Sequence, residues 1–152
     1  MILRTTCLAI LLATPTLALT IDQFEGRWRG EGVMLLDDEP EQRFRCQIRL
    51  RPIRQGETFF SGRCATAQAA QSFTYMVFED AGGAVRAENR AVNRDDLPLL
   101  MVGTAAEGLL SFTAEDNALF ELRLDGDALE FRIEGEGNQG FASGTALLNR
   151  SD

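Results

Sequence analysis

The sequence of 152 residues contains no histidine and no lysine, and these two absences exclude whole classes of chemistry. Without histidine, Ser–His and Cys–His catalysis and histidine-bound metals or haem are excluded; without lysine, Schiff-base catalysis is excluded. Neighbouring acids such as Asp95 and Asp96 lie in predicted turns, where aspartate is common because its side chain bonds to the backbone. We therefore expect no enzymatic activity, no catalytic residue, no metal site and no cofactor.

Positive charge is scarce and comes from arginine alone: 15 arginines face 23 acids, which gives a net charge of −8. An acidic chain of this kind is poorly suited to binding nucleic acid or anionic lipid. The exclusive use of arginine suggests a GC-rich bacterial genome. We expect no nucleic-acid partner, and the sequence identifies no partner protein.

Long hydrophobic runs are missing outside the N-terminus, and even there the run is shorter than the roughly 20 apolar residues of a membrane-spanning helix. Arg4 precedes an apolar core over residues 7–13, and the small residues Thr16 and Ala18 precede an expected cut before Leu19. This order of features is typical of an export signal. We expect a signal peptide over residues 1–18, a single domain over residues 19–152, no membrane span, and a periplasmic or secreted location.

Beyond residue 19 no helical periodicity is sustained, and apolar residues instead alternate with polar ones, as from Phe44 to Arg51. Such alternation is typical of strands with one buried face. Frequent turn residues imply an all-β, antiparallel up-and-down meander of about ten strands that closes into a barrel. The pair Asp125–Gly126 predicts a two-residue turn that places Leu122 opposite Leu129. The predicted strands are 27–36, 42–52, 57–66, 71–79, 83–91, 98–105, 109–115, 118–124, 127–134 and 139–149.

Cys46 and Cys64 are the two cysteines of the predicted mature chain. A three-residue loop over residues 54–56 makes positions whose numbers sum to 110 face each other, and these two cysteines meet that condition. An oxidising compartment favours their pairing. We expect a structural disulfide; the alternative is a redox-active pair, which requires a depressed thiol pKa.

The lone tryptophan lies in a glycine-rich segment, Phe24 to Gly32, where Trp28, Gly30 and Gly32 share one face of a strand. Trp28 is expected to close one end of the barrel. The glycines either leave empty volume beside it or permit strand curvature.

This segment resembles known barrels. F-x-G-x-W is similar to the lipocalin and calycin opening, and G-x-W-x-G-x-G is similar to nitrobindin-like ten-stranded barrels. The resemblance implies a lipocalin-like barrel whose cavity holds a small apolar or haem-like ligand. The chain lacks a haem-binding histidine and carries Met34-Leu35-Leu36 where those barrels have Pro-Thr-Ile. Haem chemistry therefore does not carry over.

Two functions remain open. The first is the binding of a small apolar ligand in the interior, with Trp28, Gly30, Gly32, Met34, Phe44 and Phe60 as the candidate cavity residues. The second is an interaction module with a packed interior that acts through an arginine stripe on the outer face of the second strand, namely Arg43, Arg45, Arg49 and Arg51. The simplest alternative for that stripe is a solvated face neutralised by nearby acids.

Overall fold

The computed structural model describes residues 20–37, 39–92, 97–115, 117–137 and 140–152. The predicted signal peptide and its cut before Leu19 lie outside these residues. Among the described residues, no helix is long and apolar enough to cross a membrane.

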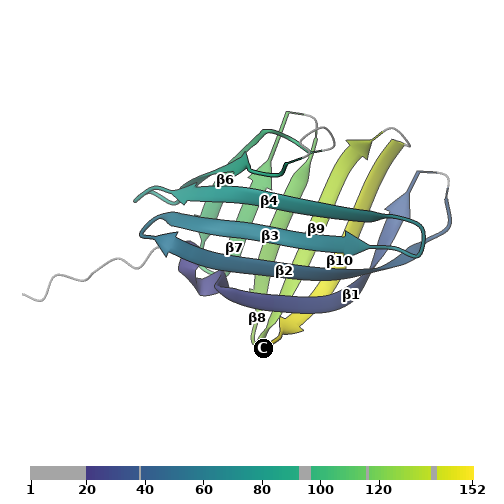
Figure 1. Ribbon diagram of the computed structural model, residues 1–152, viewed down its shortest axis with the longest axis horizontal. Helices are drawn as coiled ribbons and strands as arrows, with labels where there is room; N and C mark the ends of the chain where they lie inside the picture. The colour runs from purple at the N-terminus through teal and green to yellow at the C-terminus, as the bar shows by residue number, and fades with distance from the viewer. Residues whose placement is uncertain (1–19, 38, 93–96, 116, 138–139) are drawn as a thin grey trace, which may run out of the picture.

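Ten antiparallel strands form a closed up-and-down barrel, and neighbours in sequence are neighbours in space until β10 pairs with β1. Figure 1 shows β1 to β4 crossing the front as one layer, with β8 to β10 running steeply behind it. All ten predicted strands are confirmed, in the predicted order. They are β1 (Gly26–Leu36), β2 (Gln42–Arg54), β3 (Glu57–Ala65), β4 (Ala70–Glu79), β5 (Ala84–Asn89), β6 (Leu100–Ala106), β7 (Leu109–Thr113), β8 (Leu119–Asp125), β9 (Ala128–Gly137) and β10 (Gly140–Arg150).

The predicted register of the β2–β3 hairpin is confirmed, since Cys46 pairs with Cys64 and Leu50 with Phe60. The turn itself differs from the predicted three-residue loop. Arg54 pairs with Glu57 across a two-residue turn, and the register shifts between Pro52 and Arg54. A β-bulge adds one unpaired residue to a strand, so a bulge plus a two-residue turn gives the same register as the expected loop.

The predicted register of the β8–β9 hairpin is wrong by two positions. Leu122 faces Phe131 and Leu124 faces Leu129, because Asp125 still pairs with Ala128. The turn is therefore Gly126–Asp127, and its positive φ of 58° falls on Gly126. A shift of two keeps every side chain on its predicted face, because side chains in a strand alternate with a period of two.

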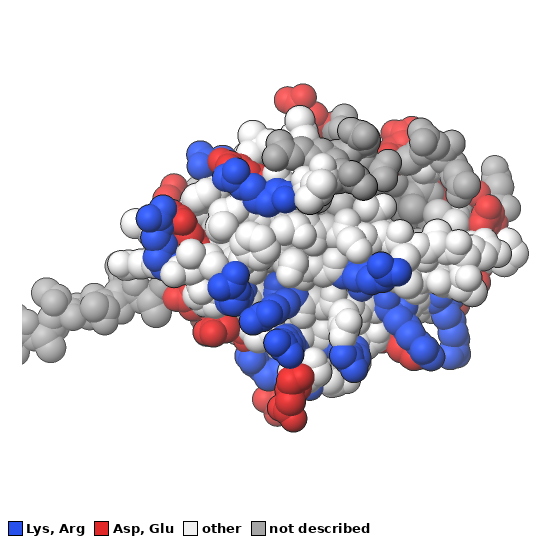
Figure 2. Space-filling view, viewed as in Figure 1, with Lys and Arg blue, Asp and Glu red and all other residues white. Residues whose placement is uncertain are grey.

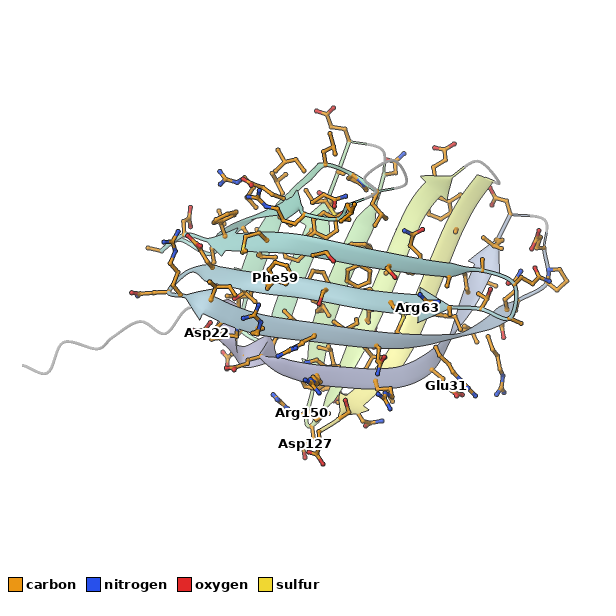
Figure 3. All side chains as sticks on the ribbon, viewed as in Figure 1. Asp22, Glu31, Phe59, Arg63, Asp127 and Arg150 are labelled. Carbon is orange, nitrogen blue, oxygen red and sulfur yellow. A yellow bond between two sulfur atoms is a disulfide. The ribbon has the colours of Figure 1, made fainter. Side chains whose placement is uncertain are left out.

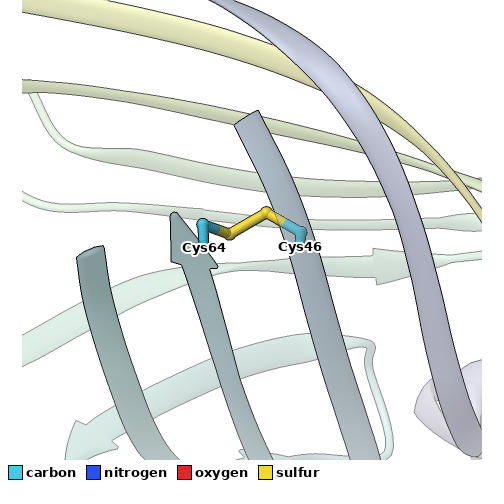
Figure 4. Close-up of a disulfide and its surroundings, with 2 residues drawn as sticks. All are labelled: Cys46 and Cys64. Atoms are coloured by element: carbon cyan, nitrogen blue, oxygen red, sulfur yellow. A yellow bond between two sulfur atoms is a disulfide. The ribbon is translucent and has the colours of Figure 1, made fainter. Parts of the chain in front are cut away.

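The disulfide between Cys46 and Cys64 is formed and joins β2 to β3 near the end of β3 (Figure 4). Both cysteines face the barrel interior and are buried. The bridge therefore staples two strands that are already paired, as a structural disulfide does.

The middle of the barrel is filled by aromatic rings. Phe60 lies 5.0 Å from Phe73, 6.2 Å from Phe112 and 6.1 Å from Phe120, measured between ring centroids. Phe120 in turn lies 5.8 Å from the ring of Tyr75, edge to face. Ring pairs at these distances are favourable beyond the area that they bury, so the centre is a packed core.

One end of the barrel is closed by a short 3₁₀ helix, η1 (Thr20–Phe24), that the sequence did not reveal. Ile21 and Phe24 are buried, and the indole Nε1 of Trp28 donates to the Phe24 carbonyl at 2.9 Å. The carboxylate of Glu79 accepts from the backbone N–H of Ile21 at 2.8 Å. Desolvation, followed by the charges of Glu79 and Glu25, raises the pKa of Asp22 in this helix. Trp28 closes this end, as predicted.

Gly30 and Gly32 leave no empty volume beside Trp28, and that expectation is wrong. A Cβ at Gly30 would overlap the carbonyl oxygen of Leu147, and a Cβ at Gly32 would overlap that of Thr145. Both atoms belong to the backbone of β10. The glycines let the backbones of β1 and β10 approach closely where the barrel closes.

Candidate functional site

An apolar cavity of 240 Å³ opens at the other end of the interior, six residues along β1 from Trp28. Six residues of strand span about 20 Å, so the closed end and the cavity lie far apart. The floor is formed by Phe73 and Phe120 of the aromatic core. The apolar walls come from four elements, β1, β9, β10 and the segment before β6, and consist of Met34, Ile133, Ala142 and Leu97.

The wall residues face inward because of strand alternation. On β10, Ala142 lies on the same face as the buried Ala146 and Leu148. On β9, Ile133 lies on the same face as the buried Phe131. Gly135 also borders the cavity, and a Cβ placed there would meet nothing within 4 Å. Gly135 therefore borders open space in the cavity, as Gly30 and Gly32 do not.

Leu97 covers one side of the cavity because Pro98, the residue after it, is fixed by hydrogen bonds from two buried side chains. The Tyr75 hydroxyl donates to the Pro98 carbonyl at 3.0 Å, and the Asn89 side-chain amide donates to the same oxygen at 3.3 Å. Tyr75 and Asn89 are both buried, on β4 and β5. Burial raises the pKa of Tyr75 to about 12, so the phenol keeps its proton and this hydrogen bond even above its ordinary pKa of 10.0.

The lining of the cavity is almost entirely apolar. Four polar residues also border it, namely Gln71, Glu134, Glu136 and Ser143, and Glu134 is paired with Arg132. Cys64 also lines the wall, so the disulfide fixes one side of the site. A cavity with such a lining accepts an apolar ligand or the apolar part of one. Among the described residues, no cluster of acids and cysteines is arranged to hold a metal ion.

Of the six predicted cavity residues, the structure brings only Met34 to this cavity. Trp28, Phe44 and Phe60 are buried in the packed core. Phe73 and Phe120 were not among the predicted cavity residues. Ile133 and Ala142 carried a signal, since alternation turns both inward. Leu97 carried none, because its position depends on the distant Tyr75 and Asn89.

Arg43, Arg45, Arg49 and Arg51 are all exposed on the outer face of β2. Two have partners: Arg45 Nε lies 2.8 Å from Glu31 of β1, and the Arg51 guanidinium lies 5.7 Å from the Phe59 ring centroid. Figure 3 shows Glu31 and Phe59 on the two strands that flank β2. This stripe is only part of a wider arginine surface, because Arg27, Arg29 and Arg63 share the same outer face.

The fold is similar to those of three solved structures. Rv2717c from M. tuberculosis matches with a TM-score of 0.64 and 14% identity over 90% of this chain and 100% of that chain. The S-type phycobiliprotein lyase CPES from Guillardia theta matches with a TM-score of 0.61 and 10% identity over 91% and 99%. EF1p2_mFAP2b bound to DFHBI matches with a TM-score of 0.50 and 9% identity over 90% and 100%.

No protein-family model and no curated protein sequence matches the chain. The ten-stranded barrel and its structural neighbours fit a lipocalin- or calycin-like fold, as the opening motif implied. No sequence match supports nitrobindin in particular.

Proposed function

We propose that the protein is an exported, non-catalytic barrel that binds a small apolar ligand at its mouth. The observation that carries this proposal is the cavity of 240 Å³, with an aromatic floor and aliphatic walls. Pockets of this composition bind ligands by removing apolar surface from water and orient them with a few polar groups.

The size of the cavity limits the ligand. At 240 Å³ it lies below the roughly 300–1,000 Å³ of ordinary ligand pockets. A neutral molecule of two or three aromatic rings or a short alkyl chain fits, and a tetrapyrrole does not. The lack of histidine also argues against haem. Haem is therefore not the proposed ligand, although the G-x-W-x-G-x-G segment resembles that of nitrobindin-like barrels.

The structural neighbours support ligand binding by this architecture. One of them was solved with a bound small molecule, DFHBI, and another is a phycobiliprotein lyase.

The disulfide supports the exported location, because such bonds persist in oxidising compartments. Intact-mass analysis of protein from a periplasmic extract is expected to give a chain that begins at or within two residues of Leu19; retention of Met1 would contradict export.

The binding test uses N-phenyl-1-naphthylamine, a neutral fluorescent dye, so that the arginines of the outer surface do not attract the probe. The wild type is expected to bind it saturably. Ala142→Phe places a ring in the cavity and is expected to abolish binding with little loss of stability. The matched control is Ala106→Phe, an equal change at an exposed position on β6, which is expected to leave binding unchanged.

Two results would reject the proposal. Dye binding by the wild type that does not saturate would show that the cavity holds no ligand of this class. Saturable binding that survives Ala142→Phe would place the site elsewhere on the molecule. Circular dichroism of both variants establishes that each is folded.

A further inference from the structure

The outer face of β1 to β4 carries two rows of polar side chains that run across the strands. Each row contains one residue from each strand, and each residue is paired with the residue of the same row on the neighbouring strand. The first row is Arg27, Arg49, Ser61 and Thr74, and the second is Arg29, Gln47, Arg63 and Ser72. We call these eight residues the arginine groove.

Charge in the arginine groove is unbalanced. Arg27 lies directly opposite Arg49, and like charges in that position repel. Further along the same two strands, Glu31 instead faces Arg45 and pairs with it at 2.8 Å.

Other arginines of the barrel pair with acids, as Arg86 does with Glu88 and Arg123 with Glu121. Across the part of the chain that the structure describes, none of the four groove arginines, Arg27, Arg29, Arg49 and Arg63, forms a salt bridge. The groove therefore holds cationic groups without anionic partners.

The surface over these rows is hollowed. A concavity of 360 Å³ is lined by all eight residues of the arginine groove, and an adjoining concavity of 690 Å³ shares Arg29, Gln47 and Arg63 with it. Figure 2 looks onto this face and shows basic side chains spread over its centre, with acidic ones mostly toward its edges. Figure 3 shows Arg63 on β3 in the same view. One acid, Asp152, lines the first concavity, and one, Glu31, which is paired with Arg45, lines the adjoining one.

The groove also supplies neutral hydrogen-bond donors. The hydroxyl groups of Ser61, Ser72 and Thr74 line the concavity. With the Gln47 amide oriented so that its oxygen faces Arg29, the guanidinium Nε donates to that oxygen at 3.0 Å. The amide nitrogen is then free to donate to a ligand. Every groove side chain offers a donor, and none offers a negative charge.

We propose that the arginine groove binds a free anion that carries two or more phosphate groups. A phosphate group brings a charge of about −1.5 to −2 and three acceptor oxygens, so one group satisfies the opposed Arg27 and Arg49, whereas one carboxylate leaves a net positive charge. The two rows lie about 7 Å apart, two residues along each strand. An anion with linked phosphates reaches both.

A soluble anion is the favoured source over a lipid headgroup. The chain as a whole has a net charge of −8, which opposes its approach to an anionic membrane. A small anion inside the groove interacts mainly with charges within a Debye length, about 10 Å at ordinary salt. The donors lie in a concavity, which admits a small molecule more readily than a flat surface.

The test is calorimetric titration with inorganic tripolyphosphate at about 0.1 M salt, where the net negative charge of the rest of the chain is screened. Arg27→Gln/Arg49→Gln is expected to weaken binding about tenfold or more, since it removes two charge-assisted donors. The matched control, Arg86→Gln/Arg123→Gln, removes the same charge from arginines that already have partners, and its binding is expected to stay close to that of the wild type. Arg29→Gln/Arg63→Gln is a second test variant, expected to weaken binding as the first does.

Three outcomes would overturn the proposal. Equal weakening in test and control variants would mean general attraction by positive charge. Citrate binding as tightly as tripolyphosphate would mean selection for charge alone. Binding to phosphatidylglycerol vesicles without binding to tripolyphosphate would identify a membrane surface. Binding of N-phenyl-1-naphthylamine at the mouth is expected to be the same in all these variants, so failure of this proposal is distinguishable from failure of the mouth site.

Discussion

Glycine acts in two different ways in this barrel, and a single added methyl group distinguishes them. Gly30→Ala puts a Cβ against the Leu147 carbonyl oxygen, a backbone atom that cannot rotate away. We expect a loss of about 1–3 kcal/mol of unfolding free energy, as in other overpacked sites. Gly135→Ala meets nothing within 4 Å and is the control. Urea unfolding measures both, and equal stability of Gly30→Ala and the wild type would contradict the close approach.

Tyr75 gives a clean titration because it is the only tyrosine. Burial raises its pKa to about 12 from the ordinary 10.0. The folded state thus favours the neutral phenol, and the unfolded state ionises first as the pH rises. Stability is expected to be unaffected by this group below about pH 10 and to fall between about 10 and 12.

The measurement is the ultraviolet absorbance of the phenolate in native protein, with Tyr75→Phe as the blank. A native midpoint at the ordinary value would show that the hydroxyl is in water and does not hold Pro98. Because Pro98 directly follows the wall residue Leu97, Tyr75→Phe is also expected to weaken dye binding at the mouth.

At the scale of elements, the alternation of residues predicted which face of each strand is buried, but it did not fix every register. The β8–β9 pair shows why. Pairing Leu122 with Leu129 or with Phe131 joins apolar side chains in both cases, so only the position of the turn determines the register. The segment Asp125-Gly126-Asp127 is compatible with a two-residue turn at Asp125–Gly126 or at Gly126–Asp127.

The β2–β3 pair was better determined because the cysteines add a second constraint. Register partners bring Cys46 to Cys64, and no neighbouring register does. The short helix η1 was missed for a physical reason: its burial depends on Glu79, at the far end of β4, and no local periodicity reports such a contact.

The disulfide is expected to raise the free energy of unfolding without being required for the barrel fold. It spans 18 residues, and in the chain-entropy model a loop of this length stabilises by about 3 kcal/mol. Cys46→Ala/Cys64→Ala is expected to lose about that amount in urea unfolding while keeping the β spectrum. Reductant should destabilise the wild type to a similar degree and leave the variant unchanged. Two reactive thiols in the untreated wild type would contradict the bridge.

At the scale of the molecule, the sequence predicted a barrel but not how much of its interior is free. The free volume depends on how rings from β3, β4, β7, β8 and β9 stack with one another, which is a property of the closed structure. The structure has features of both alternatives drawn from the sequence: a packed core, a cavity at one end, and an outer surface on which the four groove arginines form no salt bridge with any described residue.

This packing implies that the cavity is small because Phe120 forms its floor. Phe120→Ala removes the floor and is expected to cost about 3–5 kcal/mol of unfolding free energy, while extending the cavity toward Phe60 and Phe73, whose rings lie 6.1 Å and 5.2 Å away. The variant should then bind Nile red, a larger neutral dye that the wild-type cavity is too small to hold.

Phe112→Ala is the control, because Phe112 also belongs to the aromatic core, through its contact with Phe60, but does not line the cavity. It is expected to lose similar stability without gaining Nile red binding. If Phe120→Ala proves too unstable to titrate, Phe120→Leu makes a smaller opening and should show a smaller gain. Equal dye binding by the Phe120 and Phe112 variants would mean that the dye reports loosened packing, and the link between the aromatic floor and ligand size would fail.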